Sequence, residues 1–593
     1  MIRVADYIMQ RIVEQNVRHL FMVTGRGILY LSDAAAKQEG LQCVSVHHEQ
    51  AGAYAAMAYA QYNGTLGACL VSTGCAGTNA ITGVLCAWQD EVPCLFVSGQ
   101  NTLKETVRHT GLPIRTFGQQ EADIVNIVSP ITKYAVMVED PLRIAYELDK
   151  ALYLAQNGRK GPVWVDVPLD VQNMRVDPET LERFVPEKEV FLPSKNDVVF
   201  VAEALRKAER PVLLIGNGVR SAGAIEILKS LVLSYKLPVV YANSAVDVFD
   251  SDNALSLGVV SSMAANRAAN FAVQNADFIL VLGNRLTSMT VGSAPEKFAR
   301  EAVIAVVDID SAEHKKQTVN IDRMIKADVK AFLQALIQEK LSEVPLAWQN
   351  KCLHWKKIFP KCESARKEGE KIDLYHLADE LSRFLAPEAV LVCDAGLEEL
   401  IMPSTISFRE GQRCLQPVSQ GAMGYALPAS VGAYLSSKKQ TVAVIGDGSV
   451  MMNLQELQTI AHHRYPIKIL IANNDCYAVI RNRQLDLFRT RTIGTDETNG
   501  VSCPNFEKVA AAFGICYRKI ENAKQMSEIL PEVLAAEEPV ICEIITSPKQ
   551  TFLHSSFARS KSGRFVQRPL EDQSPFLPRD VFLSEMIIEP IDQ

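Results

Sequence analysis

The sequence lacks the features of a protein that crosses a membrane or binds along a nucleic acid. No run approaches the ~18 consecutive apolar residues of a membrane-spanning helix. The first six residues, MIRVAD, place an acid where a secretory signal needs an uninterrupted apolar stretch. The 61 basic and 68 acidic residues give a net charge of −7 without a long basic block. We therefore expect a cytoplasmic protein that acts on small-molecule substrates, with neither a nucleic acid nor a membrane as partner.

Cysteine pairs with the spacing of a zinc site or a redox dithiol are also missing. The chain has 13 cysteines but no Cys-x-x-Cys. Several lie inside apolar runs, as small hydrophobic residues do: Cys43, Cys69, Cys94, Cys393 and Cys542. We expect reduced, buried thiols.

The composition excludes a fibrous or disordered protein. Apolar residues make up 48% of the chain and charged residues 22%, with only 32 Gly and 27 Pro. At roughly 150 residues per domain, the length suggests three or four packed domains.

Short apolar runs that end in Gly, Asp or Pro alternate with longer helical patterns, which is typical of α/β units with parallel strands. The sequence predicts an α/β protein of three doubly wound parallel-sheet domains, of which the first and third could be structural cousins. The predicted domains are 1–176, 195–340 and 372–546, with a charged linker over 177–194, a helical connector over 341–371 and an irregular surface tail over 547–593.

The apolar runs also place the strands. In the first domain we predict strands over 19–25, 42–49, 67–74, 92–99 and 161–168. In the second they are 211–216, 238–242, 278–283 and 303–310, followed by a helix over 328–336. In the third they are 390–396, 441–446, 468–473 and 540–546.

The segment Gly446-Asp447-Gly448-Ser449 is the most informative one, because it joins a predicted strand to a helix. Glycines let the backbone approach an anion, and the helix N-terminus offers unpaired N–H groups. Asp447 can hold a hard cation against phosphate oxygens, and Asn474 ends the next predicted strand beside it. The joint pattern predicts a magnesium and phosphate site, with two unrelated turns as the alternative.

These motifs resemble those of thiamine-diphosphate-dependent enzymes, and among them the acetohydroxyacid (acetolactate) synthase type. The similarity runs through all three domains, so the resemblance implies a pyrimidine-binding first domain, a middle domain and a third domain that binds diphosphate and Mg²⁺. The metal ligands would be Asp447, Asn474 and the main-chain carbonyl of Cys476. A homo-oligomer, either a dimer or a dimer of dimers, is implied as well, because in this family the active site forms between subunits.

The resemblance assigns one indispensable carboxylate to Glu49, in the segment His47-His48-Glu49-Gln50. A carboxyl group hydrogen-bonded to N1′ of the aminopyrimidine favours the imino tautomer, whose 4′-nitrogen removes the C2 proton of the thiazolium. A solvated glutamate at a strand end is the alternative. His48 is a further candidate for the site, with a structural role equally open.

Two other segments resemble active-site loops of the family. In Gly421-Ala422-Met423-Gly424, Met423 would be the apolar wedge that bends the cofactor, although a core methionine is the plain alternative. In Gly118-Gln119-Gln120, the side chain of Gln120 would enter the site and stabilise an oxyanion. The glycine-rich turn over 72–79 matches the corresponding turn of the first domain.

The middle domain is similar, in the order of its turns, to the flavin-binding stretches of acetohydroxyacid synthases. Each turn alone is ordinary for an α/β protein. Together they imply possible FAD binding in a structural role through Gly216, Arg285, Asp308 and Asp328.

The chain departs from the family at the residues that select a second 2-oxo acid. Met289 stands at the place of an arginine, and Arg483 at the place of a tryptophan. A methionine cannot replace a guanidinium that binds a carboxylate. We therefore expect an acceptor other than a simple 2-oxo acid. Arg481 and Arg483 would suit a keto-sugar nucleotide, unless they are merely solvated.

The resulting expectation is a carboligase that decarboxylates a 2-oxo acid, pyruvate by preference, and adds the enamine to a carbonyl acceptor such as a keto-sugar nucleotide. Acetolactate synthase is the first alternative. A 2-oxo acid decarboxylase, which would release free aldehyde, is the next. A catalytically silent regulatory homologue is the non-enzymatic alternative, against which Glu49, Asp447 and Asn474 argue.

Overall fold

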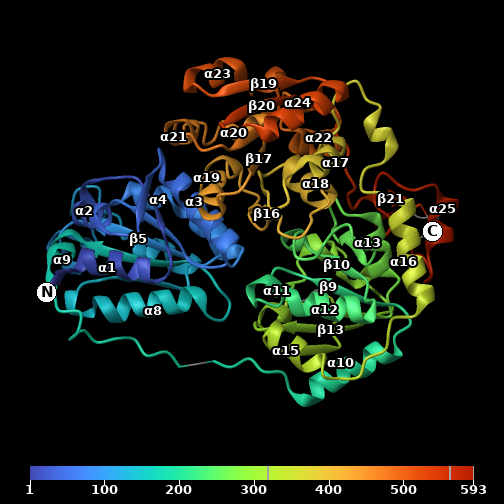
Figure 1. The fold of residues 1–593 in the computed structure, drawn as a ribbon, viewed down its shortest axis with the longest axis horizontal. Helices are drawn as coiled ribbons and strands as arrows, with labels where there is room; N and C mark the ends of the chain where they lie inside the picture. The colour runs from blue at the N-terminus through green and yellow to red at the C-terminus, as the bar shows by residue number, and fades with distance from the viewer. Residues whose placement is uncertain (188, 317–318, 560–562, 592–593) are drawn as a thin grey trace.

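The computed structural model describes residues 1–187, 189–316, 319–559 and 563–591. It contains three six-stranded sheets, in each of which all neighbouring strands are parallel. Figure 1 shows each sheet flanked by helices, with the third domain lying over the first and the second. The predicted class, α/β with three doubly wound parallel sheets, is confirmed.

The first sheet has the strand order β3-β2-β4-β5-β7-β6. Strands β4, β5 and β7 are buried along their whole length. Such strands read as continuous apolar runs, which is why the sequence revealed them. The strands are β2 (His19–Met22), β3 (Gln42–Ser45), β4 (Gly67–Val71), β5 (Cys94–Gln100), β6 (Tyr134–Met137) and β7 (Val163–Pro168).

The third sheet, β16-β15-β17-β18-β20-β19, has the same order as the first when the strands are counted along the chain. The two domains therefore share one topology. In each sheet, the second strand pairs with one side of the first strand and the third strand pairs with its other side. This reversal creates a topological switch point. It lies between β2 and β4 in the first sheet and between β15 and β17 in the third. The strands of the third sheet are β15 (Val390–Cys393), β16 (Arg413–Leu415), β17 (Thr441–Gly446), β18 (Lys468–Asn473), β19 (Cys516–Ile520) and β20 (Val540–Ile545).

The middle sheet follows a different order, β11-β10-β9-β12-β13-β14, with its switch point between β9 and β12. The predicted closing helix is present as α15 (Val329–Leu336). The strands are β9 (Pro211–Ile215), β10 (Val239–Tyr241), β11 (Ser256–Val259), β12 (Phe278–Leu282), β13 (Val303–Asp308) and β14 (Arg323–Lys326).

The first and third domains are joined through two helices, α3 (Glu49–Asn63) and α19 (Ala426–Ser437), whose buried residues belong to one core. A Cβ atom on Gly432 would lie 2.0 Å from the carbonyl oxygen of Ala55, so the two backbones touch. The hydroxyl of Tyr425 donates a hydrogen bond of 2.7 Å to Gln61. The contact fixes these two domains of one chain against each other.

The C-terminal tail differs from the irregular surface segment that its polar composition suggested. Glu571, Asp572 and Gln573 are buried. Glu571 accepts hydrogen bonds from Gln274 (2.7 Å) and Arg300 (2.9 Å) of the middle domain. Charged side chains can be buried when they have such hydrogen-bond partners. The polar composition of the tail therefore led to a wrong prediction. It also forms β21 (Phe557–Arg559), β22 (Phe565–Gln567) and α25 (Arg579–Glu585), while residues 560–562 and 592–593 lie outside the described part.

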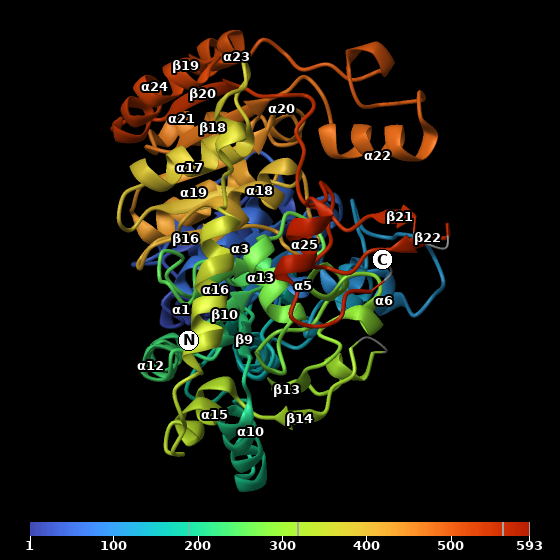
Figure 2. The same ribbon diagram turned by 90° about the vertical axis from the view of Figure 1, so that its right-hand side faces the viewer.

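The predicted connector contains α16 (Leu346–Ile358), which Figure 2 shows running along the middle domain beside α13 (Arg267–Gln274). Within the described ranges, none of the helices is long and apolar enough to cross a membrane.

Candidate functional site

The carboxyl ends of β17 and β18 bring Asp447 and Asn474 together, as their places after neighbouring strands predicted. Asp447 begins the short helix α20 (Asp447–Val450) and is only 3% exposed. Its carboxylate accepts N–H groups of Gly448 (2.7 Å), Asn474 (3.1 Å) and Asp475 (2.7 Å). Burial nevertheless raises the pKa of Asp447 to about 6. A cation beside the carboxylate would offset this cost of burial.

This edge fits a magnesium ion that is shared with a diphosphate. Among the described residues, no three His, Cys, Asp or Glu side chains form a metal cluster. The donors on offer are instead one carboxylate, the amide oxygen of Asn474 and the carbonyl of Cys476. Mg²⁺ is commonly held by one or two carboxylates, with phosphate oxygens and water completing its shell.

Asp394, at the end of β15 across the switch point, is a site residue that the sequence analysis missed. It is fully buried and accepts N–H groups of Gly424 (3.0 Å) and Ala426 (2.7 Å). Burial raises the pKa of Asp394 to about 7. The clamp fixes the turn that carries the half-buried Met423. An acid directly after an apolar strand was the signal that could have identified it.

Glu398, in the first turn of α18 (Leu397–Thr405), is a second buried acid at this edge. Its carboxyl oxygens lie 3.5 Å from the position that a Cβ atom on Gly446 would occupy. Burial, reinforced by the charges of Asp447 and Asp394, raises the pKa of Glu398 to about 8. These surroundings favour the neutral form of the Glu398 carboxyl group.

Glu49 lies at the start of α3, so the predicted strand over 42–49 was too long: β3 ends at Ser45. Its carboxylate accepts a hydrogen bond of 2.9 Å from the amide of Asn79, a residue of the glycine-rich turn. His48 caps α3, because its Nδ1 accepts the N–H of Gln50 (3.2 Å). This contact is the structural role that the sequence left open.

Gln120 is exposed and lies in the left-handed region, with φ of 58°. Such a conformation costs energy in a residue other than glycine, and it is found preferentially at functional sites. A pocket at the carboxyl edge of the first sheet includes Gln120, Thr73 and Gln100 in its lining. The turn over 72–79 contacts Glu49 through Asn79. It also contacts Gln120, because a Cβ atom on Gly74 would lie 1.7 Å from the carbonyl oxygen of Gln120.

The candidate site residues form two groups in different domains: Glu49 lies in the first domain, and Asp447 and Asn474 lie in the third. In the described part of the chain, no hydrogen bond or ion pair joins Glu49 to the third domain; its neighbour Gln50 does accept a hydrogen bond of 3.1 Å from Asn453. One chain thus brings together Asp447, Asn474 and the Met423 turn, but does not link them directly to Glu49.

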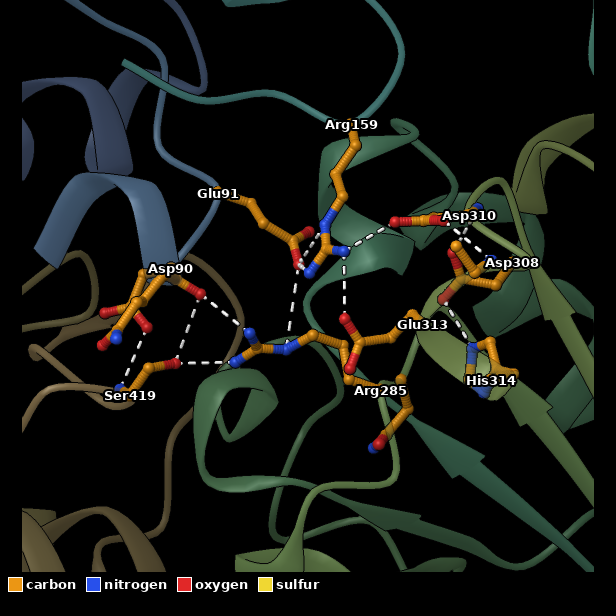
Figure 3. A network of polar contacts seen from close by, with 12 residues as sticks. Asp90, Glu91, Arg159, Arg285, Asp308, Asp310, Glu313, His314 and Ser419 are labelled. Atoms are coloured by element: carbon orange, nitrogen blue, oxygen red, sulfur yellow. Dashed lines mark hydrogen bonds and ion pairs between the residues drawn. The ribbon is translucent and has the colours of Figure 1, made fainter. Parts of the chain in front are cut away.

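Residues predicted to bind a flavin are engaged by the protein itself (Figure 3). Arg285 donates to the carbonyl of Gln89 (2.9 Å) and the hydroxyl of Ser419 (2.6 Å), which belong to the first and third domains. Asp308 accepts the N–H of Asp310 (2.9 Å) and lies 3.3 Å from His314. The surrounding network continues through Arg159, which pairs with Glu91, Asp310 and Glu313.

The other two flavin candidates have local roles. Asp328 caps α15 by accepting the N–H of Ala331 (3.0 Å). A Cβ atom on Gly216 would lie 2.2 Å from the carbonyl oxygen of Gly283, so close packing of two turns requires this glycine. Arg285, Asp308 and Asp328 thus each have a hydrogen-bond partner within the chain.

The structure also shows the surroundings of the residues that depart from the family pattern. Met289 lies in α14 (Ser288–Val291), where its carbonyl accepts the N–H of Ser262 (2.6 Å). On α22 (Ala478–Phe488), Arg481 is paired with Asp496 at 2.9 Å, whereas Arg483 is exposed. Arg481 therefore already has an anionic partner.

Three family models match the chain in succession. They are the thiamine pyrophosphate enzyme N-terminal TPP binding domain over residues 2–127, the central domain over 198–336 and the C-terminal TPP binding domain over 394–544. The chain therefore belongs to the thiamine pyrophosphate (thiamine diphosphate) enzyme family, and the resemblance drawn from the motifs is confirmed.

Within this family the chain is similar to acetolactate synthases. It is 30% identical over 560 residues to the acetolactate synthase large subunit of Lactococcus lactis, with 93% of each chain covered. It is also 30% identical over 548 residues to acetolactate synthase isozyme 2 large subunit of Escherichia coli, covering 91% of this chain and 95% of that one. The expectation of an acetolactate synthase-like, thiamine-diphosphate-dependent enzyme is confirmed.

Proposed function

We propose that this protein is a carboligase of the acetolactate synthase type, which decarboxylates pyruvate and joins the remaining two-carbon unit to a second 2-oxo acid. The similarity to acetolactate synthases along nine-tenths of the chain carries the proposal. It favours a 2-oxo acid acceptor over the keto-sugar nucleotide that Met289 and Arg483 suggested.

Bound thiamine diphosphate supplies the electron sink that both decarboxylation and carbon–carbon bond formation need. Asp447, Asn474 and the carbonyl of Cys476 would hold the magnesium ion. Met423, on the turn fixed by Asp394, would pack against the cofactor rings. Glu49, oriented by Asn79, would hold the proton at N1′ of the pyrimidine. Gln120 would donate a hydrogen bond to the substrate oxygen.

We infer that the active unit is a homo-oligomer, a dimer or a dimer of dimers, in which the first domain of one chain meets the third domain of another. Exposed apolar side chains in the first and in the third domain support this inference. Phe117, close to Gln120, is 57% exposed, and Leu487 and Phe488 on α22 are 62% and 51% exposed. Figure 2 shows α22 projecting from the third domain, where a second chain could cover it.

The relatives bear the name "large subunit", so a separate small subunit is a further candidate partner. Co-purification from the source organism would test for it. A second polypeptide in constant ratio to this chain would establish such a complex.

A keto-sugar nucleotide acceptor is retained as the second candidate because Arg483 is exposed on α22 and, among the described residues, forms no ion pair. Mass spectrometry of products from the holoprotein separates the possibilities. Acetolactate from pyruvate alone supports the main proposal. A product that appears only when a keto-sugar nucleotide is added supports the second candidate, and free acetaldehyde alone indicates a decarboxylase.

A further inference from the structure

Arg26 lies at the topological switch point of the first sheet, a position to which neither the motifs nor the comparisons assign a role. It opens the short helix η1 (Arg26–Ile28) after β2, and the turn over 72–79 follows β4 on the other side of the switch point. In open α/β sheets, ligands bind outside the carboxyl ends of the strands at this point. The location alone makes Arg26 a candidate for ligand binding.

The backbone on both sides of Arg26 is tightly packed. A Cβ atom on Gly25 would lie 2.4 Å from the hydroxyl of Ser72, and one on Gly27 would lie 1.8 Å from the hydroxyl of Thr73. The N–H of Gly27 donates to Ser72 (3.1 Å). Arg26 therefore lies between two positions that have room only for glycine.

The pocket that contains Gln120 is lined by Arg26 and by neutral polar side chains, including Thr73, Gln100 and Asn101. Arg26 is the only charged residue in its lining within the described ranges. One Nη atom donates to the side-chain oxygen of Gln119. Asn101 donates a hydrogen bond of 3.0 Å to the main-chain carbonyl of Gln119, which positions the backbone of that residue.

Arg26 is exposed, and most of its N–H donors have no partner among the described residues. A guanidinium has five N–H donors, and the contact with Gln119 uses one nitrogen. In the part of the chain that the structure describes, no carboxylate forms an ion pair with Arg26. By contrast, Arg108, which is also in the first domain, pairs with Asp123 at 3.2 Å. An unpaired guanidinium next to neutral donors is suited to a carboxylate, which it can bind through two parallel hydrogen bonds.

We propose that Arg26 binds the carboxylate of the acceptor 2-oxo acid and so supplies the cation that Met289 cannot. The inference rests on the proposed function, because it requires an acceptor with a carboxylate. It places the specificity-determining cation in the first domain, beside Gln120, rather than in the middle domain.

The chemistry of the two substrates assigns Arg26 to the acceptor. The donor must lose its carboxylate as CO₂, and a tight ion pair would stabilise this group before the bond breaks. The acceptor keeps its carboxylate in the product. An ion pair with the acceptor therefore aids binding without raising the barrier to decarboxylation.

The test compares two reactions of the holoprotein with thiamine diphosphate and Mg²⁺. Pyruvate alone gives acetolactate, for which the acceptor has a carboxylate. Pyruvate with acetaldehyde gives acetoin, for which it has none. In Arg26→Gln, we expect kcat/KM for acetolactate to fall about ten- to hundredfold through the loss of a charged hydrogen bond, with acetoin formation within about twofold of the wild type.

Two further variants complete the design. Arg26→Lys keeps the charge but loses the planar fork, so its ratio of acetolactate to acetoin should lie between those of the wild type and Arg26→Gln. This variant also keeps the test decisive if Arg26→Gln folds poorly. Arg175→Gln removes an exposed arginine from the separate two-stranded sheet of β1 (Ile2–Arg3) and β8 (Arg175–Val176), and should leave both rates unchanged.

The outcomes are distinguishable. An unchanged product ratio in Arg26→Gln and Arg26→Lys, with a wild type that makes acetolactate, overturns the role of Arg26 alone. An equal fall of both products assigns Arg26 to the donor or to the fold and also overturns it. A wild type that makes no acetolactate overturns the proposed function, and the acceptor role with it.

Discussion

The carboxyl groups of the candidate site differ in the hydrogen bonds that they accept from the protein. Asp447 accepts three backbone N–H groups at the edge predicted to bind magnesium. Asp394 uses both of its oxygens to fix the Met423 turn. Among the described residues, Glu49 accepts one hydrogen bond, from Asn79, which leaves its other oxygen for a ligand. The groups therefore differ in how much of their hydrogen-bonding capacity the protein itself uses.

Replacement of Glu49 tests its role in proton transfer. Glu49→Gln should still bind thiamine diphosphate, because the amide is close in shape to the carboxyl group. Turnover should fall by at least about 100-fold, since an amide cannot supply the proton at N1′. Exchange of the C2 proton for deuterium, followed by NMR, measures the step. Exchange at the wild-type rate would contradict the role, and Glu39→Gln, at an exposed position in the first domain, is the matched control.

Asp447 should be required for cofactor retention. Both this carboxylate and the diphosphate are anionic, so a cation must lie between them. We expect Asp447→Ala to abolish magnesium-dependent binding of thiamine diphosphate, and a chelator to release the cofactor from the wild type. Calorimetry measures both effects. Undiminished binding by Asp447→Ala would remove the diphosphate assignment.

At the scale of secondary-structure elements, the loops at the carboxyl ends of the strands have different roles in the three domains. In the third sheet they carry Asp447, the proposed magnesium ligand, and in the first they carry Arg26 and Gln120. In the middle sheet, Arg285 and Asp310 instead connect to the neighbouring domains, through Ser419 and Arg159. The middle domain thus uses this edge for contacts between domains.

The contacts of the middle domain lead us to predict an enzyme that works without a flavin. Because Arg285, Asp308 and Asp328 already have partners in the chain, we expect purified protein to show no flavin absorbance. Its activity with thiamine diphosphate and Mg²⁺ should not rise when FAD is added. A stoichiometric flavin, released on denaturation and seen by its visible spectrum, would contradict this expectation.

At the scale of the whole molecule, the first and third domains repeat one strand order, and both direct candidate site residues to a switch point. The α3–α19 contact already joins these domains within a chain. A second chain is therefore the proposed means of bringing a Glu49 to an Asp447.

Mixing two inactive variants tests this assembly. If sites form between chains, a dimer of Glu49→Gln with Asp447→Ala has one intact site and one doubly altered site. Random mixing makes half of the dimers of this kind, so about a quarter of wild-type activity should return. Sites within single chains would give no recovery. Analytical ultracentrifugation should show a dimer or larger, and a fully active monomer would contradict the proposal.

The sequence determined the class of the fold and the proximity of Asp447 and Asn474, because both follow from local patterns. Buried central strands appear as apolar runs, and β17 and β18 were predicted to their ends. In the three six-stranded sheets, the strands that were missed lie at the edges: β6, β11, β14, β16 and β19. An edge strand pairs on one side only, so a short or polar segment can form it without a continuous apolar run.

Only the tertiary structure decided which side chains meet across domains. The partners of Arg285 lie 134 and 196 residues away in the chain. Arg26 and Gln119, which share a pocket, are 93 residues apart. No local pattern reveals a contact between residues so far apart in the chain. The order in which strands join a sheet and the packing of α3 on α19 decide which of these residues meet. The sequence by itself therefore determined the chemistry that the chain carries, and the three-dimensional packing decided which of its polar groups are paired and which are left for a ligand.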